Sequence, residues 1–468
     1  MIKDIQNKLK NKEITCTDLA QSYLNKIKDN QDLNCFISLS ENVLNEAKKI
    51  DEKIQKNEEL KPLDGIFIAV KDNILVKGMY CTAASKMLED YIAAYDATVI
   101  NKLKDAGAII IGKTNMDEFA MGSSNETSAF GKVLNPINKE CVPGGSSGGS
   151  ACAINKELST IALGSDTAGS IRQPACFCGV VGFKPSYGSV SRYGLISMSS
   201  SLDQIGPITS SVEDSEIIFN IIKGIDQNDS TTSEVKDLNL KNKITIGLPK
   251  EYFQDLDDDV KEFMDQAITE LKNQGFDLKE ISLPHTKYAL PCYDIIMPAE
   301  VSSNLSRYDN IRYGTHFDKL TKDISINDLD DVYLKIRGEK LGKEVKRRIL
   351  LGMFILSAGY YDAYYTKAQK VRQILINEFE NIFKDVDFIL TPTTPTKAFR
   401  FNEKQDPVKM YQSDILTVSA NLTGLPAISL PVHTSDLPVG IQIIGQRFED
   451  LNLLSIAKQI EKICTTSN

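Results

Sequence analysis

The sequence has no excess of basic residues. Its 468 residues include 54 Lys and Arg against 63 Asp and Glu, which gives a formal net charge of −9 at pH 7. Sequence-independent binding of nucleic acid needs cationic side chains that displace counterions from the phosphates. The chain as a whole is therefore not expected to attract a polynucleotide, and any such partner must be held locally or by another subunit.

The sequence also has few histidines, no C-x-x-C pair and no long apolar run. Its nine cysteines are scattered and odd in number, which predicts neither a disulfide framework nor a zinc site. No apolar stretch reaches the roughly 18 residues of a membrane-spanning helix, and the polar first eight residues are unlike a signal peptide. We expect a soluble, cytoplasmic protein with reduced thiols, no bound metal and no membrane contact.

What the sequence does contain is the composition of an ordinary globular protein. Hydrophobic residues make up 42% and charged residues 25%, which excludes disordered, collagen-like and coiled-coil chains. Short β-rich runs at 66–70 and 108–111 alternate with helical stretches such as 97–105. This alternation predicts an α/β fold with a parallel or mixed sheet. The length allows about three domains or one large α/β unit.

Two segments differ in pattern from the rest. Residues 1–60 have helical apolar spacing, with Thr17 and Ser40 as candidate N-caps, and predict a helical segment packed on a domain of residues 61–468. The polar stretch 226–243 is a candidate surface linker. Further strands are expected at 244–248, 388–390, 427–430 and 439–444, and helical regions at 260–271, 343–383 and 451–463.

Residues 107–114 match the phosphate-loop pattern G-x-x-x-x-G-K-[ST]. A phosphate loop needs a strand before its first glycine and a flexible turn between the glycines, so that backbone amides can surround a phosphate. Here the residues between the glycines are themselves typical of a strand. A helix end at Gly107, a buried strand and a turn at Gly112 account for the match. We therefore do not expect this segment to bind a nucleotide.

Residues 145–149 match the G-x-S-x-G nucleophile elbow, with Ser147 at its centre. An elbow needs a hydrophobic strand leading into it and a histidine base, but residues 138–143 are polar and end in proline. The three histidines have no glycine-rich or otherwise site-like surroundings; they are His285, His316 and His433. A Ser147/His-dependent α/β-hydrolase stays open as a less favoured alternative.

A third set of residues combines one lysine with two serines. Lys71 directly follows the apolar strand 66–70, Ser146 lies in a glycine- and serine-rich run, and Ser170 ends a second such run. A lysine at the end of a buried strand loses hydration, which lowers its pKa and lets the neutral amine act as a general base. A hydroxyl between amine and nucleophile can accept one proton while it donates another. Ser-Lys machinery of this kind is an accepted alternative to a histidine triad.

The small residues Ala168 and Gly169 precede Ser170 and would let backbone amides converge on one point, as an oxyanion hole requires. The runs 144–151 (G-G-S-S-G-G-S-A) and 164–175 (G-S-D-T-A-G-S-I-R-Q-P-A), with Lys-Asp-Asn upstream, resemble the defining run of the amidase signature family. That resemblance implies an α/β/α fold, with a central mixed β-sheet flanked by helices, over the domain 61–468.

The resemblance also implies roles for individual residues. Ser170 would be the nucleophile that forms an acyl-enzyme, Ser146 a relay serine preceded by a cis peptide bond, and Lys71 the base. The oxyanion hole would use the amides from Thr167 to Ser170. The sequence departs from the family at Ala168, where many members have glycine, but an amide N–H is present in either case.

Segments spread along most of the chain are similar to one branch of this family, the glutaminase (A) subunits of glutamyl-tRNA(Gln)/aspartyl-tRNA(Asn) amidotransferases. They are residues 312–314, 346–352, 357–365, 391–396 and 410–416. This similarity implies that the chain hydrolyses glutamine to glutamate and ammonia without a cofactor of its own. Arg348 would hold the substrate carboxylate and Asp414 its α-amine, with Tyr293 nearby.

The same similarity implies a heterotrimer. A B subunit would use ATP and Mg²⁺, hold the misacylated tRNA and consume the ammonia, and a small C subunit would clamp the other two subunits together. A free-standing amidase that acts on small amides is the alternative from the same family.

Overall fold

The computed structural model describes residues 1–241, 243–309, 313–314, 329–432 and 436–466. The strands of this part of the chain form one eleven-stranded sheet in the order β1-β3-β2-β4-β6-β5-β10-β11-β9-β7-β8. The pairings β3–β2, β2–β4, β9–β7 and β7–β8 are parallel, and the others are antiparallel. The predicted mixed sheet is confirmed.

The strands are β1 (Phe36–Leu39), β2 (Phe67–Lys71), β3 (Ile109–Thr114), β4 (Ile161–Asp166), β5 (Val181–Lys184), β6 (Gln204–Thr209), β7 (Thr245–Pro249), β8 (Asp277–Ile281), β9 (Phe388–Pro392), β10 (Ala427–Val432) and β11 (Val439–Ile444). The helices are α1 (Ile2–Lys10), α2 (Cys16–Asp29), α3 (Val43–Gln55), α4 (Thr98–Asp105), α5 (Gly148–Asn155), α6 (Arg172–Cys178), α7 (Val212–Ile222), α8 (Asp258–Asn273), α9 (Ala289–Asn304), α11 (Leu329–Lys340), α12 (Lys343–Leu356), α13 (Lys367–Ile382), α14 (Pro407–Tyr411), α15 (Val418–Leu422) and α16 (Asp450–Thr466).

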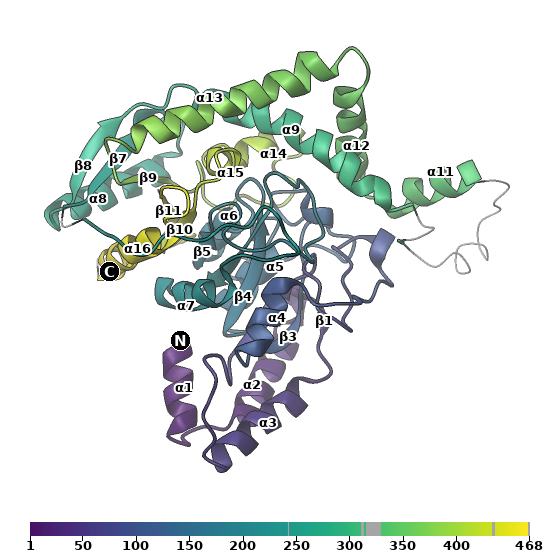
Figure 1. The fold of residues 1–468 in the computed structure, drawn as a ribbon, viewed down its shortest axis with the longest axis vertical. Helices are drawn as coiled ribbons and strands as arrows, with labels where there is room; N and C mark the ends of the chain where they lie inside the picture. Colours follow the sequence, from purple (N-terminus) through teal and green to yellow (C-terminus); the bar gives the residue numbers. More distant parts are fainter. Residues whose placement is uncertain (242, 310–312, 315–328, 433–435, 467–468) are drawn as a thin grey trace.

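Helices flank this sheet in two groups (Figure 1). Helices α5 and α6 contact each other and pack on β4, β5 and β10, whereas α7 and α16 contact each other and pack on β6 and β10. Apolar side chains along the strands, Phe67, Leu163 and Ile428 among them, form the largest core. A separate core lies among α9, α12, α13 and α15. The candidate functional residues come from both regions.

Both predicted N-caps are wrong. Helix α2 is capped by Thr15, whose side chain accepts a hydrogen bond from the Asp18 amide at 3.0 Å, while Thr17 lies inside the helix and donates its hydroxyl hydrogen to Asp51 at 2.5 Å. Helix α3 begins at Val43, so Ser40 lies in the turn before it. The partner of Thr17 lies 34 residues away, and Ser40 Oγ accepts a hydrogen bond from the Asn42 amide at 3.3 Å; apolar spacing reveals neither contact.

The predicted helical region 343–383 is divided in two. Helix α12 ends at Leu356, and the chain turns through Gly359, which has φ +86°. This left-handed conformation suits glycine and interrupts a helix. The short helix η7 (Asp362–Thr366) then leads into α13.

Residues 1–60 and 226–243 are the two segments whose sequence pattern differs from the rest. Residues 1–60 include the expected helices but also β1, which pairs with β3 at the edge of the sheet. Residues 226–241 contain no helix or strand. The division of the chain at residue 60 and the linker between halves stay predictions.

The phosphate-loop pattern lies on a buried strand. Gly107 follows α4 with φ +98°, as expected, and residues 109–114 form β3. Gly112 lies within that strand, so the turn predicted there is wrong. A Cβ at Gly112 would come within 2.6 Å of the Ser38 carbonyl oxygen, and the glycine therefore allows β1 to approach closely. Lys113 is fully buried and forms an ion pair with Asp72 at 3.3 Å.

Candidate active site

The site begins where parallel strands end together. Strands β2, β3 and β4 are parallel, so their carboxyl ends meet at one edge of the sheet, the usual place for sites in α/β proteins. Lys71 is the last residue of β2. The register that pairs Val70 with Leu163 sets Lys71 beside the end of β4, from which the chain continues to Ser170.

Lys71 is held in a fully buried position. Its Nζ donates hydrogen bonds to Ser146 Oγ at 2.7 Å and to the Ser165 carbonyl oxygen at 3.1 Å. Burial lowers the pKa of Lys71 to about 7, although the negative charges of nearby aspartates oppose this shift. A neutral amine is therefore available close to neutral pH, and its immediate partner is a serine hydroxyl.

The loop that carries Ser146 is tightly enclosed. The Gly145–Ser146 peptide bond is cis, and the Gly145 amide donates to Gln173 Oε1 at 2.9 Å. The Ser146 carbonyl oxygen accepts from the Asp117 amide at 3.3 Å. A Cβ at Gly145 would lie 2.1 Å from Asp117 Oδ2. Because this space is already filled, no larger residue fits at position 145 without displacing the loop.

Ser170 lies in the short loop between β4 and α6 and is 7% exposed. The carbonyls of Ala168, Gly169 and Ser170 accept hydrogen bonds from Thr417 Oγ1 at 2.5 Å, Gln173 N at 2.8 Å and Ser147 N at 3.1 Å, respectively. In the part of the chain that the structure describes, the amide N–H groups of residues 167–170 donate no hydrogen bond to another protein atom. They remain available to a bound oxygen atom.

An internal ion pair braces this loop. Arg172 and Asp166 are both fully buried, with an Nη2–Oδ1 distance of 3.0 Å, and the Ile171 amide donates to Asp166 Oδ2 at 3.1 Å. Burial raises the pKa of Asp166, but the Arg172 guanidinium, the charge of Lys184 and the hydrogen bond from Asn421 together outweigh it and lower the pKa to about 2. Arg172 also donates to the Thr417 carbonyl oxygen at 2.9 Å.

No role was predicted for Asp166, Arg172 or Thr417. The first two belong to the run 164–175 that carries the family resemblance, so their position was visible although their pairing was not. Thr417 stands outside any motif. A Cβ at Gly169, which has φ +145°, would lie 2.3 Å from Thr417 Oγ1, which shows how closely this distant residue encloses the loop.

The structure brings Arg348, Asp414 and Tyr293 together from three different elements. Arg348 lies on α12, Tyr293 on α9 and Asp414 at the end of the short helix η8 (Gln412–Asp414). Their exposed fractions are 4%, 5% and 8%, respectively. Burial raises the pKa of Tyr293, and the charges of both Arg348 and Asp414 act on it. Arg348 is therefore not on a solvated helix face.

Arg348 already has partners within the protein. Its Nε donates to Glu344 Oε1 at 2.6 Å, and its guanidinium lies 5.1 Å from the centre of the Tyr411 ring. Burial raises the pKa of Glu344, but the charges of Arg348 and Arg347 and the hydrogen bonds from Arg348 and Tyr411 together outweigh it and hold the pKa below the usual value. Tyr411 completes the group, because its hydroxyl donates to the same Glu344 oxygen at 2.8 Å.

Asp414 is less fully paired. Its carboxylate accepts a hydrogen bond from Ser123 Oγ at 2.5 Å. Burial raises the pKa of Asp414 to about 7, so a cation bound beside it would favour its ionised form. Arg348 and Asp414 thus supply one positive and one negative group in an enclosed space.

The residues of the Ser147 hypothesis do not assemble in the described part of the chain. Residues 142–147 form no strand, and Ser147 Oγ donates to the Ser165 carbonyl oxygen at 3.2 Å. His285 Nδ1 is hydrogen-bonded with Glu378 Oε1 at 2.7 Å. His316 and His433 lie outside the described residues.

The described residues contain neither a candidate metal site nor a candidate membrane span. No group of three or more His, Cys, Asp and Glu side chains is arranged to hold a metal ion. No helix has the length and apolar character to cross a membrane.

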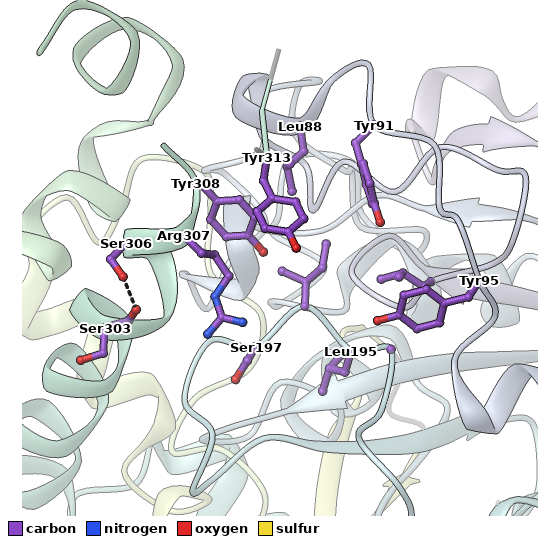
Figure 2. Close-up of a pocket in the computed structure, with 13 residues that line it drawn as sticks. Leu88, Tyr91, Tyr95, Leu195, Ser197, Ser303, Ser306, Arg307, Tyr308 and Tyr313 are labelled. Carbon is purple, nitrogen blue, oxygen red and sulfur yellow. Dashed lines mark hydrogen bonds between the residues drawn. The ribbon is translucent and has the colours of Figure 1, made fainter. Parts of the chain in front are cut away.

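A separate cavity of about 400 Å³ lies near this site. Figure 2 shows Tyr91, Tyr308 and Tyr313 at its edge, with the Arg307 guanidinium directed toward Ser197. Lys71, Ser146 and Ser170 do not line it. Its link to the site is indirect: Ser197 Oγ donates to Asp203 Oδ2 at 3.0 Å, and Asp203 also accepts from Thr167 Oγ1 at 2.8 Å.

The fold and this set of buried lysine and serines define a class of protein. The family model described as Amidase matches residues 18–454. The chain therefore belongs to the amidase signature family, and both the resemblance and the predicted α/β/α fold are confirmed.

Within that family the similar proteins share one name. The chain is 50% identical to the A subunit of glutamyl-tRNA(Gln) amidotransferase from Fusobacterium nucleatum, over 98% of this chain and 96% of the relative. It is 49% identical to the protein of that name from Carboxydothermus hydrogenoformans, with the same coverage.

Solved structures agree with this family. The crystal structure of the glutamyl-tRNA(Gln) amidotransferase A subunit from Thermotoga maritima matches with a TM-score of 0.79 and 43% identity, and covers 96% of this chain and 91% of that one. A peptide amidase from Stenotrophomonas maltophilia matches with a TM-score of 0.82 and 28% identity, over 99% of this chain and 96% of that one.

Proposed function

We propose that the chain is the glutamine-hydrolysing subunit of a tRNA-dependent amidotransferase. The observation that carries the proposal is the 2.7 Å hydrogen bond from the buried Lys71 amine to Ser146, beside the loop of Ser170. The two nearly full-length relatives described above, named as A subunits of glutamyl-tRNA(Gln) amidotransferase, support the choice of glutamine over other amides.

The proposed reaction starts with proton transfer. Ser170 Oγ attacks the side-chain amide carbon of glutamine while its proton passes to Ser146 Oγ, and the Ser146 proton passes to the neutral Nζ of Lys71. The free amides of residues 167–170 donate hydrogen bonds to the oxyanion of the tetrahedral intermediate. These amides need no reorganisation, because the carbonyls of the same loop are fixed.

The intermediate then collapses. The C–N bond breaks, the proton returns from Lys71 through Ser146 to the leaving nitrogen, and ammonia departs. A γ-glutamyl ester on Ser170 remains. Water attacks this ester by the same relay, which releases glutamate and restores the Ser170 hydroxyl.

Glutamine itself is recognised through its two charges. Arg348 binds the α-carboxylate, Asp414 binds the α-ammonium group and Tyr293 lines the space between them. An ammonium and a carboxylate that leave water each need a fixed partner of opposite charge. The near-neutral pKa of Asp414 supports this role, because the bound ammonium would keep the carboxylate ionised.

The ammonia would be used by other subunits of the complex. A B subunit holds the misacylated tRNA and uses ATP with Mg²⁺, and a C subunit clamps the assembly, while this chain has no cofactor of its own. The net charge of −9 supports tRNA binding by a partner. A cytoplasmic location is part of the proposal; the free thiols of the eight described cysteine side chains suit a reducing compartment.

The second candidate is a free-standing amidase, favoured by the fold similarity to peptide amidase. Glutamine and propionamide hydrolysis by the purified chain, alone and with the candidate B and C subunits, separates the two. Glutamine preferred over propionamide, with transfer of its amide nitrogen to misacylated tRNA in the reconstituted complex, is the expected result. Equal use of both amides with no transfer would favour the free-standing enzyme.

A further inference from the structure

One face of the molecule carries exposed apolar side chains in a continuous stretch of sequence. They lie on the second half of α12 and in the turn toward α13, and each is 40–66% exposed. We call them the α12 apolar surface: Leu350, Leu351, Met353, Phe354, Tyr360, Tyr361 and Tyr364.

Helix α12 is apolar on two faces where one would suffice. Its inner face is buried against α9, so closely that a Cβ at Gly352 would lie 1.9 Å from the Pro298 carbonyl oxygen. On the outer face Leu350, Met353 and Phe354 recur at helical spacing. A helix at a protein surface normally places polar residues on its outer face, as the first half of α12 does at 343–347. We therefore expect a binding partner to cover the outer face of the second half of α12.

Three of the four aromatic rings of this surface are held against one another. The Phe354 ring centre lies 4.5 Å from that of Tyr360 and 6.0 Å from that of Tyr364. Rings ordered in this way lose little further entropy on binding, which is a property of the aromatic anchors of protein interfaces. In Figure 1 the end of α12 and the turn that follows lie at the periphery of the molecule.

The surface is large enough for a specific interface. An aromatic side chain presents roughly 150–250 Å², so an exposed fraction near one half leaves on the order of 100 Å² on each ring. The four rings therefore provide roughly 400 Å², and the exposed parts of Leu350, Leu351 and Met353 add to this area. The surface thus approaches the ~800 Å² that each partner contributes to a standard protein interface. Isolated apolar residues on a surface need no explanation, but a contiguous patch of this size does.

The charge of the surface selects the kind of partner. From residue 349 to residue 365, Asp362 is the only charged residue. RNA and anionic membranes are bound by Lys and Arg interleaved with aromatic rings, and this stretch contains neither basic residue. An apolar protein surface fits.

We propose that the α12 apolar surface is where the B subunit of the amidotransferase, the subunit that uses the ammonia, docks on this chain. The proposal rests on the proposed function, which requires such a subunit. The same helix carries Arg348 on its buried face, so the docked subunit lies beside the end of the site that binds the amino acid. The partner buries its own apolar side chains on the Phe354, Tyr360 and Tyr364 rings.

The test measures binding of the purified partner subunits to the full chain. In Leu350→Glu/Phe354→Glu two outer positions become charged while helix propensity is kept. The matched control, Ile225→Glu/Leu238→Glu, also replaces two exposed apolar residues with glutamate, at positions outside this surface that are 62% and 54% exposed. Thermal unfolding and propionamide hydrolysis of each variant check that the fold and the catalytic residues are intact.

We expect the Kd of the Leu350→Glu/Phe354→Glu chain to rise about 100-fold or more, while the control binds like the wild type. Unchanged binding of both variants would overturn the docking surface alone. Self-association of the wild type that the first variant abolishes, with subunit binding unaffected, would overturn it in favour of a second copy. A wild-type chain that binds no partner subunit would overturn the proposed function and this proposal together.

Discussion

The two ends of the candidate site are built in different ways. At the catalytic end, Lys71 ends β2, Ser170 lies in the loop that follows the neighbouring parallel strand β4, and Ser146 lies in the loop before α5. At the amino-acid end, Arg348 and Asp414 come from separate elements outside the sheet, beside the second core. The positions of the residues at the catalytic end depend on sheet register. Those at the amino-acid end depend on how helices pack.

If the proposed roles hold, this difference separates the residues that carry out the chemistry from those that select the substrate. The loop of Ser170 is braced by a buried ion pair and is not free to vary, whereas Arg348 rests on a side-chain partner, Glu344, from its own helix. We expect changes at the catalytic end to abolish hydrolysis of every amide. Changes at the amino-acid end should affect glutamine only.

The largest expected effect is at Ser170, the proposed nucleophile. Ser170→Ala should lower kcat for glutamine by about 10⁴-fold or more, because no acyl-enzyme can form, and propionamide should be lost equally. Circular dichroism and thermal unfolding should show an intact fold, since only one hydroxyl is removed. Ser147→Ala is the matched control and should cost far less. A dead Ser147→Ala beside an active Ser170→Ala would reverse the assignment.

The next largest loss of activity is expected at Lys71, the proposed base. Lys71→Arg is expected to lose about 10²- to 10⁴-fold in kcat, because a guanidinium does not deprotonate in a protein. In the wild type, kcat/KM for propionamide should rise with pH through about 7, since the neutral amine forms above the lowered pKa of Lys71. For glutamine, the ionisation of Asp414 falls in the same pH range and should contribute to the same rise in kcat/KM. A propionamide profile that is flat between pH 5 and 9 would argue against Lys71 as the base.

The amino-acid end should show selective losses. Arg348→Ala or Asp414→Ala leaves one substrate charge unpaired in an enclosed site, a penalty of roughly 2–5 kcal/mol, or about 30-fold to several thousand-fold in kcat/KM for glutamine. Propionamide carries neither charge and should be spared. Steady-state kinetics with both substrates decides the point. An equal loss on both would mean that these residues shape the site instead of binding the amino acid.

The smallest expected effect on function is at Lys113, the lysine of the phosphate-loop pattern. Calorimetry should detect no binding of ATP to the isolated wild-type chain, and filter binding at physiological salt should detect no appreciable binding of tRNA. Lys113→Ala should instead lower the free energy of unfolding by about 3–5 kcal/mol, because it leaves Asp72 buried and unpaired. Tight ATP binding that Lys113→Ala removes would restore the phosphate-loop interpretation.

The sequence predicts most of what lies at the catalytic end. Lys71 could be placed at a strand end, and the glycine-rich runs around Ser146 and Ser170 mark tight loops, because these features are local. A turn was expected at Gly112 because the phosphate-loop pattern does not reveal that β1 approaches this glycine closely. Thr417, Glu344 and Ser123 could not be found in this way, since each acts through a contact that only the packed fold creates.

The most direct test of the account is to trap the acyl-enzyme. The chain is mixed with glutamine, quenched rapidly in acid and digested, and the peptides are mapped by mass spectrometry. We predict one γ-glutamyl group on Ser170, absent from Ser170→Ala and never on Ser147. A γ-glutamyl group on any other residue, or glutamine hydrolysis that persists at the wild-type rate in Ser170→Ala, would contradict it.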